Sequence, residues 1–202
     1  MAITTYATLK TSIIEWSKRG DILSLVDDFI DLAESEMWTQ LRIRDMETTS
    51  TGSVSARTLA LPTGFQQMRR LRLTSGGSSC DLEYVTPESM AVDGTSGLPS
   101  QFTITSQIEF NRTPDATYTY EIIHYASLTA LSDSATSNGV LSRFPMVYLY
   151  GALKYCAQWG LNGEEEIKYS NAFSNAIMQA NSTDRRGRHG PAPVMKVEGS
   201  KP

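Results

Sequence analysis

The spacing of apolar residues changes twice along this chain, from helical to alternating and back to helical. Over residues 6–16 and again over residues 22–41, apolar side chains recur every three or four positions, which is typical of amphipathic helices. Gly20 and Asp21 lie between the two stretches and fit a helix stop followed by a helix cap. The N-terminal part therefore predicts two antiparallel helices joined by a short corner.

The middle of the chain has the pattern of a small antiparallel β domain. From residue 48 to residue 132, short runs of alternating apolar and polar residues are separated by turn formers such as Pro62, Gly64 and Pro114. The longest run covers residues 118–125 and is apolar on both faces. This indicates either a central strand or a strand that a neighbouring molecule covers.

Helical spacing returns after the β-rich region. The helix that is expected to begin at Pro145 is apolar nearly all round, so it must be covered on several sides, within the subunit or by neighbouring subunits. Beyond residue 182 the periodicity stops, and arginines, glycines and prolines predominate, a composition that cannot order itself. We therefore predict an α+β chain. Its parts are a four-helix bundle from residues 1–47 and 133–182, an inserted β-rich domain at 48–132, and an extended C-terminal tail at 183–202.

Composition limits the classes of function. With 202 residues and a mass of 22.3 kDa, the chain suits one domain with an insertion. Its 18 lysines and arginines against 22 aspartates and glutamates give a net charge of −4, which argues against a protein that coats duplex DNA. Cys80 and Cys156 stand in unrelated contexts, so we expect reduced thiols and no zinc site. Nucleotide-binding loops and long uncharged apolar stretches are absent, so we expect no cofactor and no membrane span.

The titratable residues do not indicate a reaction centre. The residue types of a catalytic triad are present in Ser142, His124 and Asp133, but no nucleophile turn surrounds the serine. Glu34 is expected to form a structural salt bridge with Arg42 or Arg44. We therefore predict a protein without catalytic residues.

Several motifs occur along the chain in the order in which one protein family carries them. They are Ala33-Glu34, Leu41-Arg42-Ile43-Arg44-Asp45-Met46-Glu47, Leu59-Ala60-Leu61-Pro62, Leu82-Glu83-Tyr84-Val85-Thr86-Pro87-Glu88, Ala130-Leu131-Ser132-Asp133 and Tyr148-Leu149-Tyr150-Gly151-Ala152-Leu153. With these motifs the chain resembles, over about residues 5–188, the head-to-tail connector adaptor proteins of tailed bacteriophages. Residues 111–115 depart from the family, whose members carry a more proline-rich turn there.

The resemblance implies an adaptor-like bundle and a structural virion protein that forms a homo-oligomeric, portal-matched twelvefold ring. Such a ring would dock under the portal protein in the neck and present its other side to tail or nozzle proteins. DNA would pass through the lumen without specific binding during ejection, and assembly would take place in the host cytoplasm. Two alternatives stay open: a tail-completion or nozzle component, and a nucleic-acid-binding protein whose arginines contact only phosphates.

Three groups of residues are candidates for contacts in such an assembly. An acidic helix face could line the channel and repel phosphates, or it could be an ordinary solvated face: Asp27, Asp28 and Asp31. Aromatic residues of the apolar helix could contact neighbouring subunits or fill the bundle core: Tyr148, Tyr150 and Trp159. Arginines and prolines of the tail are expected to bind the portal as an extended arm: Arg185, Arg186, Arg188, Pro191 and Pro193.

Overall fold

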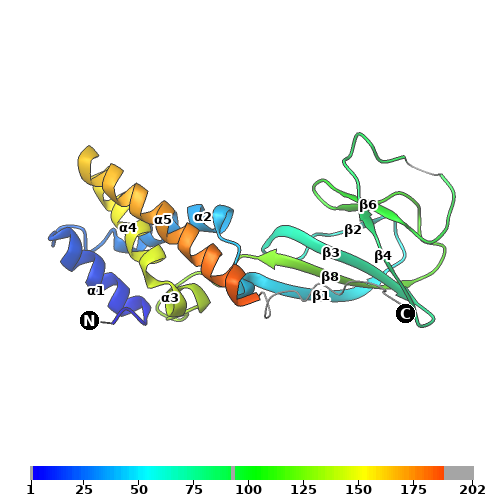
Figure 1. Cartoon of the computed structure of the whole chain (residues 1–202), viewed down its shortest axis with the longest axis horizontal. Helices are drawn as coiled ribbons and strands as arrows, with labels where there is room; N and C mark the ends of the chain where they lie inside the picture. The colour runs from blue at the N-terminus through cyan, green and yellow to red at the C-terminus, as the bar shows by residue number, and fades with distance from the viewer. Residues whose placement is uncertain (1, 92–93, 189–202) are drawn as a thin grey trace, which may run out of the picture. The chain divides into compact units, whose positions relative to one another are not determined.

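The computed structural model describes residues 2–91 and 94–188. The chain divides into two compact units. The helical unit contains the chain up to Arg44 and again from Thr129, and the β unit contains Asp45–Leu128. Figure 1 shows that the helices gather in the first unit and the strands in the second. The α+β class is confirmed, with five α-helices and two small sheets in the described part of the chain.

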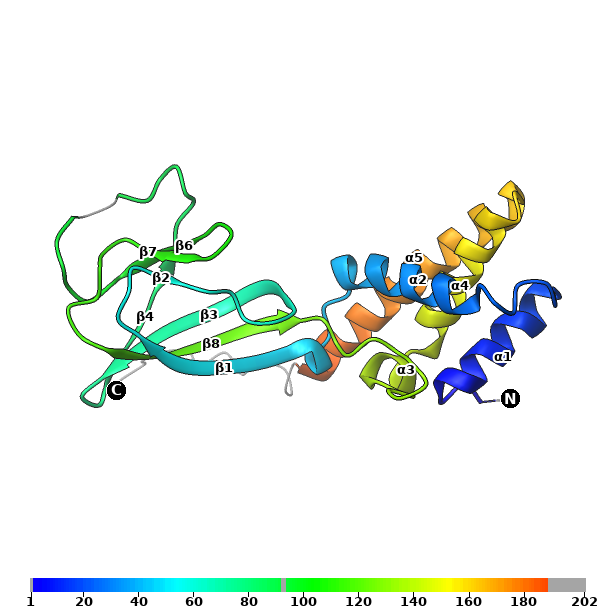
Figure 2. The same cartoon turned by 180° about the vertical axis from the view of Figure 1, so that it is seen from behind.

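The helical unit is built around helix α4. Its helices are α1 (Tyr6–Ser17), α2 (Val26–Gln40), α3 (Gly139–Arg143), α4 (Pro145–Trp159) and α5 (Gly163–Arg188). Helix α4 packs against each of the other four, and Figure 1 and Figure 2 show it among them from opposite sides. This central place explains why α4 is apolar nearly all round: Val147, Leu149 and Leu153 are all buried.

Gly151 lets the central helix approach two neighbours closely. A Cβ atom at this position would lie 2.8 Å from the Cβ of Ala33 on α2 and 3.0 Å from Cε2 of Phe173 on α5. The first distance is shorter than Cβ atoms in proteins show, and the second would require the Phe173 ring to shift. The packing of α2 and α5 on α4 therefore depends on a residue without a side chain.

The corner between α1 and α2 differs from the sequence prediction. The left-handed residue that ends α1 is Lys18, with φ of 53°, and not Gly20. Asp21 does not cap α2; it pairs with Arg19 at 2.5 Å instead. The physical reason is that the buried Ile22 begins a separate turn, so that α2 starts only after it.

Helix α5 is longer than the sequence predicted. It continues to Arg188, so the prediction that an extended tail begins at residue 183 is wrong for residues 183–188. The reason is tertiary, because side chains near the end of α5 bind the backbone that follows α2. Pro191, Pro193 and the rest of the predicted tail lie outside the described residues.

The β unit consists of two four-stranded sheets. A 3₁₀ turn, η1 (Arg44–Met46), precedes its first strand. The first sheet is antiparallel, in the order β1 (Glu47–Val54), β8 (Tyr118–Ala126), β3 (Phe65–Ser75) and β4 (Ser78–Asp81). The second sheet has the order β2 (Thr58–Leu59), β7 (Ile108–Phe110), β6 (Gln101–Ile104) and β5 (Glu83–Tyr84).

One strand pair corrects the prediction of an antiparallel domain. β5 and β6 are parallel, which the separation of Tyr84 and Gln101 along the chain allows, because parallel neighbours need a connection of a dozen residues or more. β8 lies between β1 and β3, so its two apolar faces are those of a central strand. Leu71 and Ile122 of the first sheet form one core with Phe102, Ile108 and Phe110 of the second.

Candidate interaction surfaces

A buried hydrogen-bond network joins α2, α4 and the segment that re-enters the helical unit. The Tyr148 hydroxyl donates to Oε1 of Glu34 at 2.8 Å and accepts from Nδ2 of Asn138 at 2.6 Å. The same Glu34 oxygen accepts from the backbone N–H of Leu131 at 2.9 Å. Tyr148 is fully buried, so it lies in the core of the helical unit and has no surface to offer a neighbouring subunit.

Glu34 acts through hydrogen bonds and not through a salt bridge. Burial raises the pKa of its carboxyl group, and this effect outweighs the opposing effect of the Leu131 N–H. The predicted salt bridge to Arg42 or Arg44 is wrong. Arg42 donates to backbone carbonyls at the end of α2, whereas Arg44 pairs with Asp184.

Two of the three predicted aromatic residues of α4 reach the surface. Trp159 is 47% exposed, and Tyr150 is half-buried. The ring of Tyr150 meets that of Trp16 edge-on, with centroids 6.2 Å apart. Together with Tyr169 these two rings line a groove of about 410 Å³, which we call the aromatic groove. Unlike Tyr148, this cluster is accessible to another protein.

The acidic side chains predicted on one face of α2 are exposed, but one of the three is ion-paired. Asp27, Asp28 and Asp31 are all exposed. Lys10 of α1 pairs with Asp27 at 3.1 Å, and neither Asp28 nor Asp31 forms an ion pair with another described residue. Two uncompensated carboxylates therefore remain on this face.

The last part of α5 holds the segment by which the chain leaves the helical unit. Oδ1 of Asn181 accepts from the N–H of Arg42 at 2.8 Å, and its Nδ2 donates to the carbonyl of Gln40 at 3.1 Å. The carboxylate of Asp184 accepts from the N–H of Arg44 at 2.8 Å. We call Asn181 and Asp184 the α5 anchor. Asn181 thus satisfies the Gln40 carbonyl, which α2 leaves without a helical partner, and the two side chains together satisfy N–H groups of the segment that follows α2.

Cations surround the buried carboxylate of the anchor. Asp184 is 2% exposed, with guanidinium nitrogens of Arg143 at 3.3 Å, of Arg188 at 2.8 Å and of Arg44 at 3.7 Å. Burial raises the pKa of this carboxyl group. The hydrogen bonds from Arg188 and from the Arg44 N–H outweigh burial, so the pKa lies below its usual value.

The three arginines predicted to bind a portal therefore have different environments. Arg188 pairs with Asp184 one helical turn earlier. Arg185 and Arg186 are exposed and form no ion pair with residues that the structure describes. The spacing of Asp184 and Arg188 at i and i+4 was the sequence signal for a longer helix.

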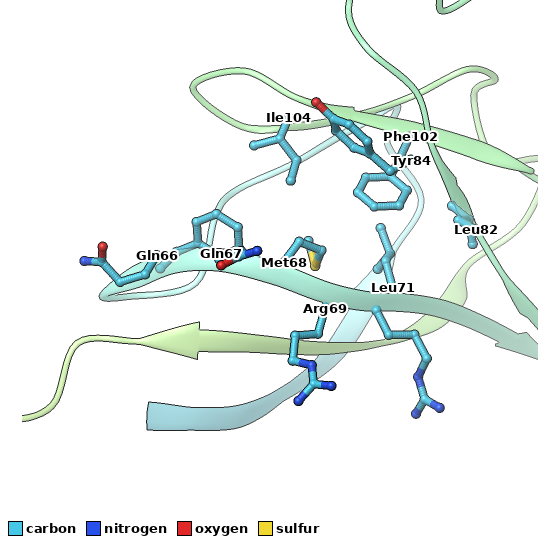
Figure 3. Close-up of a pocket in the computed structure, with 11 residues that line it drawn as sticks. Gln66, Gln67, Met68, Arg69, Leu71, Leu82, Tyr84, Phe102 and Ile104 are labelled. Atoms are coloured by element: carbon cyan, nitrogen blue, oxygen red, sulfur yellow. The ribbon is translucent and has the colours of Figure 1, made fainter. Parts of the chain in front are cut away.

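The β unit contains a groove of about 610 Å³ between its two sheets, shown in Figure 3. Its lining residues are 65–71, Leu82, Tyr84, Phe102 and Ile104. Figure 3 shows Met68 and Leu71 pointing toward Tyr84 and Phe102, and Arg69 pointing away. Tyr84 is 53% exposed at this groove. Sequence reasoning missed the groove because its walls come from separate segments that only the sheet packing brings together.

The arginines of β3 are already paired within the β unit. The pairs are Arg69 with Glu47, Arg70 with Glu121, and Arg72 with Asp81. Each cation faces a carboxylate, so this strand offers phosphates little uncompensated positive charge.

The three residues Ser142, His124 and Asp133 are divided between the two units. His124 is fully buried in the β unit and stacks on Phe65 with centroids 5.7 Å apart, whereas Ser142 and Asp133 belong to the helical unit. Over residues 2–91 and 94–188, no group of three or more His, Cys, Asp or Glu side chains is placed to hold a metal ion. Within the same ranges, no helix is long and apolar enough to cross a membrane.

The sequence matches the SU10 adaptor protein family over residues 4–195. The chain belongs to this family. Its members are phage head–tail adaptors, so this adaptor has a structural role at the head–tail connection. None of the curated proteins matches the chain.

An adaptor acts through surfaces that bind other proteins. The geometry of the described residues leaves three candidate binding surfaces. On the helical unit they are the aromatic groove with Trp159, and the exposed pair Arg185 and Arg186 at the end of α5. On the β unit the candidate is the apolar groove beside Tyr84.

Proposed function

We propose that this adaptor forms a homo-oligomeric ring between the portal protein and the tail or nozzle proteins in the neck of a tailed phage. The ring has twelvefold symmetry to match the portal, and DNA passes through its lumen without specific contacts. The observation that carries this proposal is the family match over residues 4–195. Helices α1, α2, α4 and α5 form the adaptor bundle, and the groove of the β unit supplies a further docking surface.

The exposed apolar side chains of the helical unit support a role in assembly. Single exposed apolar residues are ordinary on monomers, and those that adjoin one another mark partner contacts. The described part of the helical unit has eight large exposed apolar residues from which such contacts could be built. They are Trp16, Leu23, Leu32, Met146, Trp159, Leu161, Ile167 and Met178. Neighbouring subunits in a ring would cover part of this surface.

Charge supports the assignment of two further contacts. Arg185 and Arg186 bind carboxylates of the portal, since both are exposed and unengaged among the described residues. Asp28 and Asp31 face the lumen, where negative side chains repel DNA phosphates and allow DNA to slide.

Truncation after Arg188 tests the portal contact. This variant keeps the α5 anchor, whereas truncation after Ala180 would delete Asn181 and Asp184 and so destabilise the bundle. We expect the shorter chain to keep its melting temperature and to be lost from particles assembled with it as the sole copy. The double variant Arg185→Ala/Arg186→Ala tests the arginines separately. Normal incorporation of both variants would contradict a portal-binding C-terminus.

Electron microscopy of negatively stained particles with a labelled adaptor tests its position. We expect the label at one capsid vertex, between head and tail. A label at the far end of the tail would indicate a nozzle component instead. Absence of the protein from purified particles would refute the proposed function.

A further inference from the structure

Leu161, in the turn between α4 and α5, combines two unfavourable features. Its side chain is 93% exposed to solvent, and its backbone is left-handed, with φ of 53°. Full exposure leaves an apolar side chain in water. The left-handed conformation brings Cβ too close to the following carbonyl oxygen, which glycine avoids.

The fold of the turn does not need a leucine. Its geometry is fixed by backbone hydrogen bonds: Gly160 donates to Cys156, Leu161 donates to Gln158, and Asn162 donates to Ala157. Glycine would make the same bonds without strain. A leucine at such a position is consistent with a contact outside the subunit, because strained exposed residues often mark functional sites.

The aromatic groove can accept such a side chain. Its volume of about 410 Å³ exceeds that of an aliphatic side chain, and its walls are the rings of Trp16, Tyr150 and Tyr169. Ala172 lies in its lining and leaves room beside the rings. Burial of a leucine between aromatic rings removes apolar surface of both partners from water.

The charges around the two features are complementary. Glu164 and Glu166 follow Leu161 in the first turn of α5, whereas Glu165 between them belongs to the groove. Lys18 and Lys168 line the aromatic groove, together with Glu165 as its one acidic residue. Neither lysine forms an ion pair among the described residues. The acidic turn that carries Leu161 thus matches a groove whose rim is mainly basic.

We propose that Leu161 of one subunit inserts into the aromatic groove of the next subunit. This inference rests on the proposed ring and names the surfaces that build it. The two surfaces are different patches of one chain, so the contact is head-to-tail and repeats from copy to copy until a ring closes. The partner is therefore a second copy of this chain.

Disulfide trapping in assembled particles tests the contact. The variant Leu161→Cys/Ala172→Cys is made in a background with Cys80→Ser and Cys156→Ala, and particles that contain it are oxidised. Non-reducing electrophoresis is expected to show a ladder of adaptor multimers, and each single-cysteine variant to show none. Particles that contain the double variant without a ladder would overturn the inference, as would a crosslink from Leu161→Cys to a different protein. Absence of the protein from particles would instead refute the proposed function.

The variant Leu161→Gly separates contact from folding. Since glycine relieves the backbone strain, its melting temperature should rise or stay unchanged, while incorporation into particles should fall at least tenfold. Leu98→Gln is the control, because Leu98 is 45% exposed in the β unit and does not belong to the turn or to the aromatic groove. Incorporation of Leu161→Gly at the wild-type level would overturn the inference, as would an equal loss for Leu98→Gln.

Discussion

The substitution Asp184→Asn tests whether the α5 anchor holds the helical unit together. The asparagine keeps an oxygen that can accept from the Arg44 N–H, but it removes the charge that faces Arg143 and Arg188. Hydrogen bonds to charged groups contribute about 1.5–3 kcal/mol each. Both arginine side chains retain some exposure, at 28% and 25%, so water compensates part of the loss. We expect the helical unit to lose about 2–3 kcal/mol of unfolding free energy.

The chain offers a fluorescent probe for this unit. The three tryptophans of the sequence, Trp16, Trp38 and Trp159, all belong to the helical unit. Their fluorescence during urea denaturation therefore follows that unit. With an m-value of about 2 kcal/mol per molar urea, the midpoint of Asp184→Asn should fall by about 1 M. Asp21→Asn is the control, because it breaks a solvent-exposed pair with Arg19 and should change the midpoint little.

Acid provides a second readout of the same residue. The pKa of Asp184 in the folded chain lies below its unfolded value of 3.8, so the unfolded state binds more protons in this range. Its contribution to stability is full above that value and is lost as pH falls through the folded pKa. The difference between wild type and Asp184→Asn should therefore shrink in acid. Equal urea midpoints at neutral pH, or a difference that does not shrink, would refute the role of the anchor.

Gly151→Ala should destabilise the helical unit by about 1–3 kcal/mol, because the new methyl group would clash with Ala33. An unchanged melting temperature would show that α2 can move away from α4 without loss of stability. Glu34 has the opposite pH signature to Asp184, since burial raises its pKa above the unfolded value of 4.5, and its charged form opposes folding. The unfolding free energy of the wild type should therefore fall as pH rises above 4.5. Glu34→Gln keeps an acceptor for the Leu131 N–H and should not show this fall. Equal slopes of unfolding free energy against pH for the two proteins would contradict the prediction. Sedimentation should show the isolated adaptor as a monomer that needs the portal as a template, and a stable closed ring without portal would disprove that expectation.

The sequence predicted the order of helices and strands because periodicity is a local property. Residues 22–41 and the alternating runs around residue 120 carry their spacing whatever they pack against. The end of α5 was predicted wrongly, since Asn181 and Asp184 bind backbone groups about 140 positions earlier in the chain. The parallel pair of β5 and β6 was missed for a similar reason, because the connection over residues 85–100 carries no signal of its direction.

The sequence by itself determined the α+β class and, through ordered motifs, the adaptor family. Only the tertiary structure decided which aromatic residues of α4 are exposed at the surface. Tyr148 is fully buried and bound to Glu34, whereas Trp159 on the same helix is 47% exposed. A helix that is apolar all round has no stripe to show which side faces inward. Its orientation follows from how α1, α2 and α5 pack around it, and that depends on contacts between distant parts of the chain.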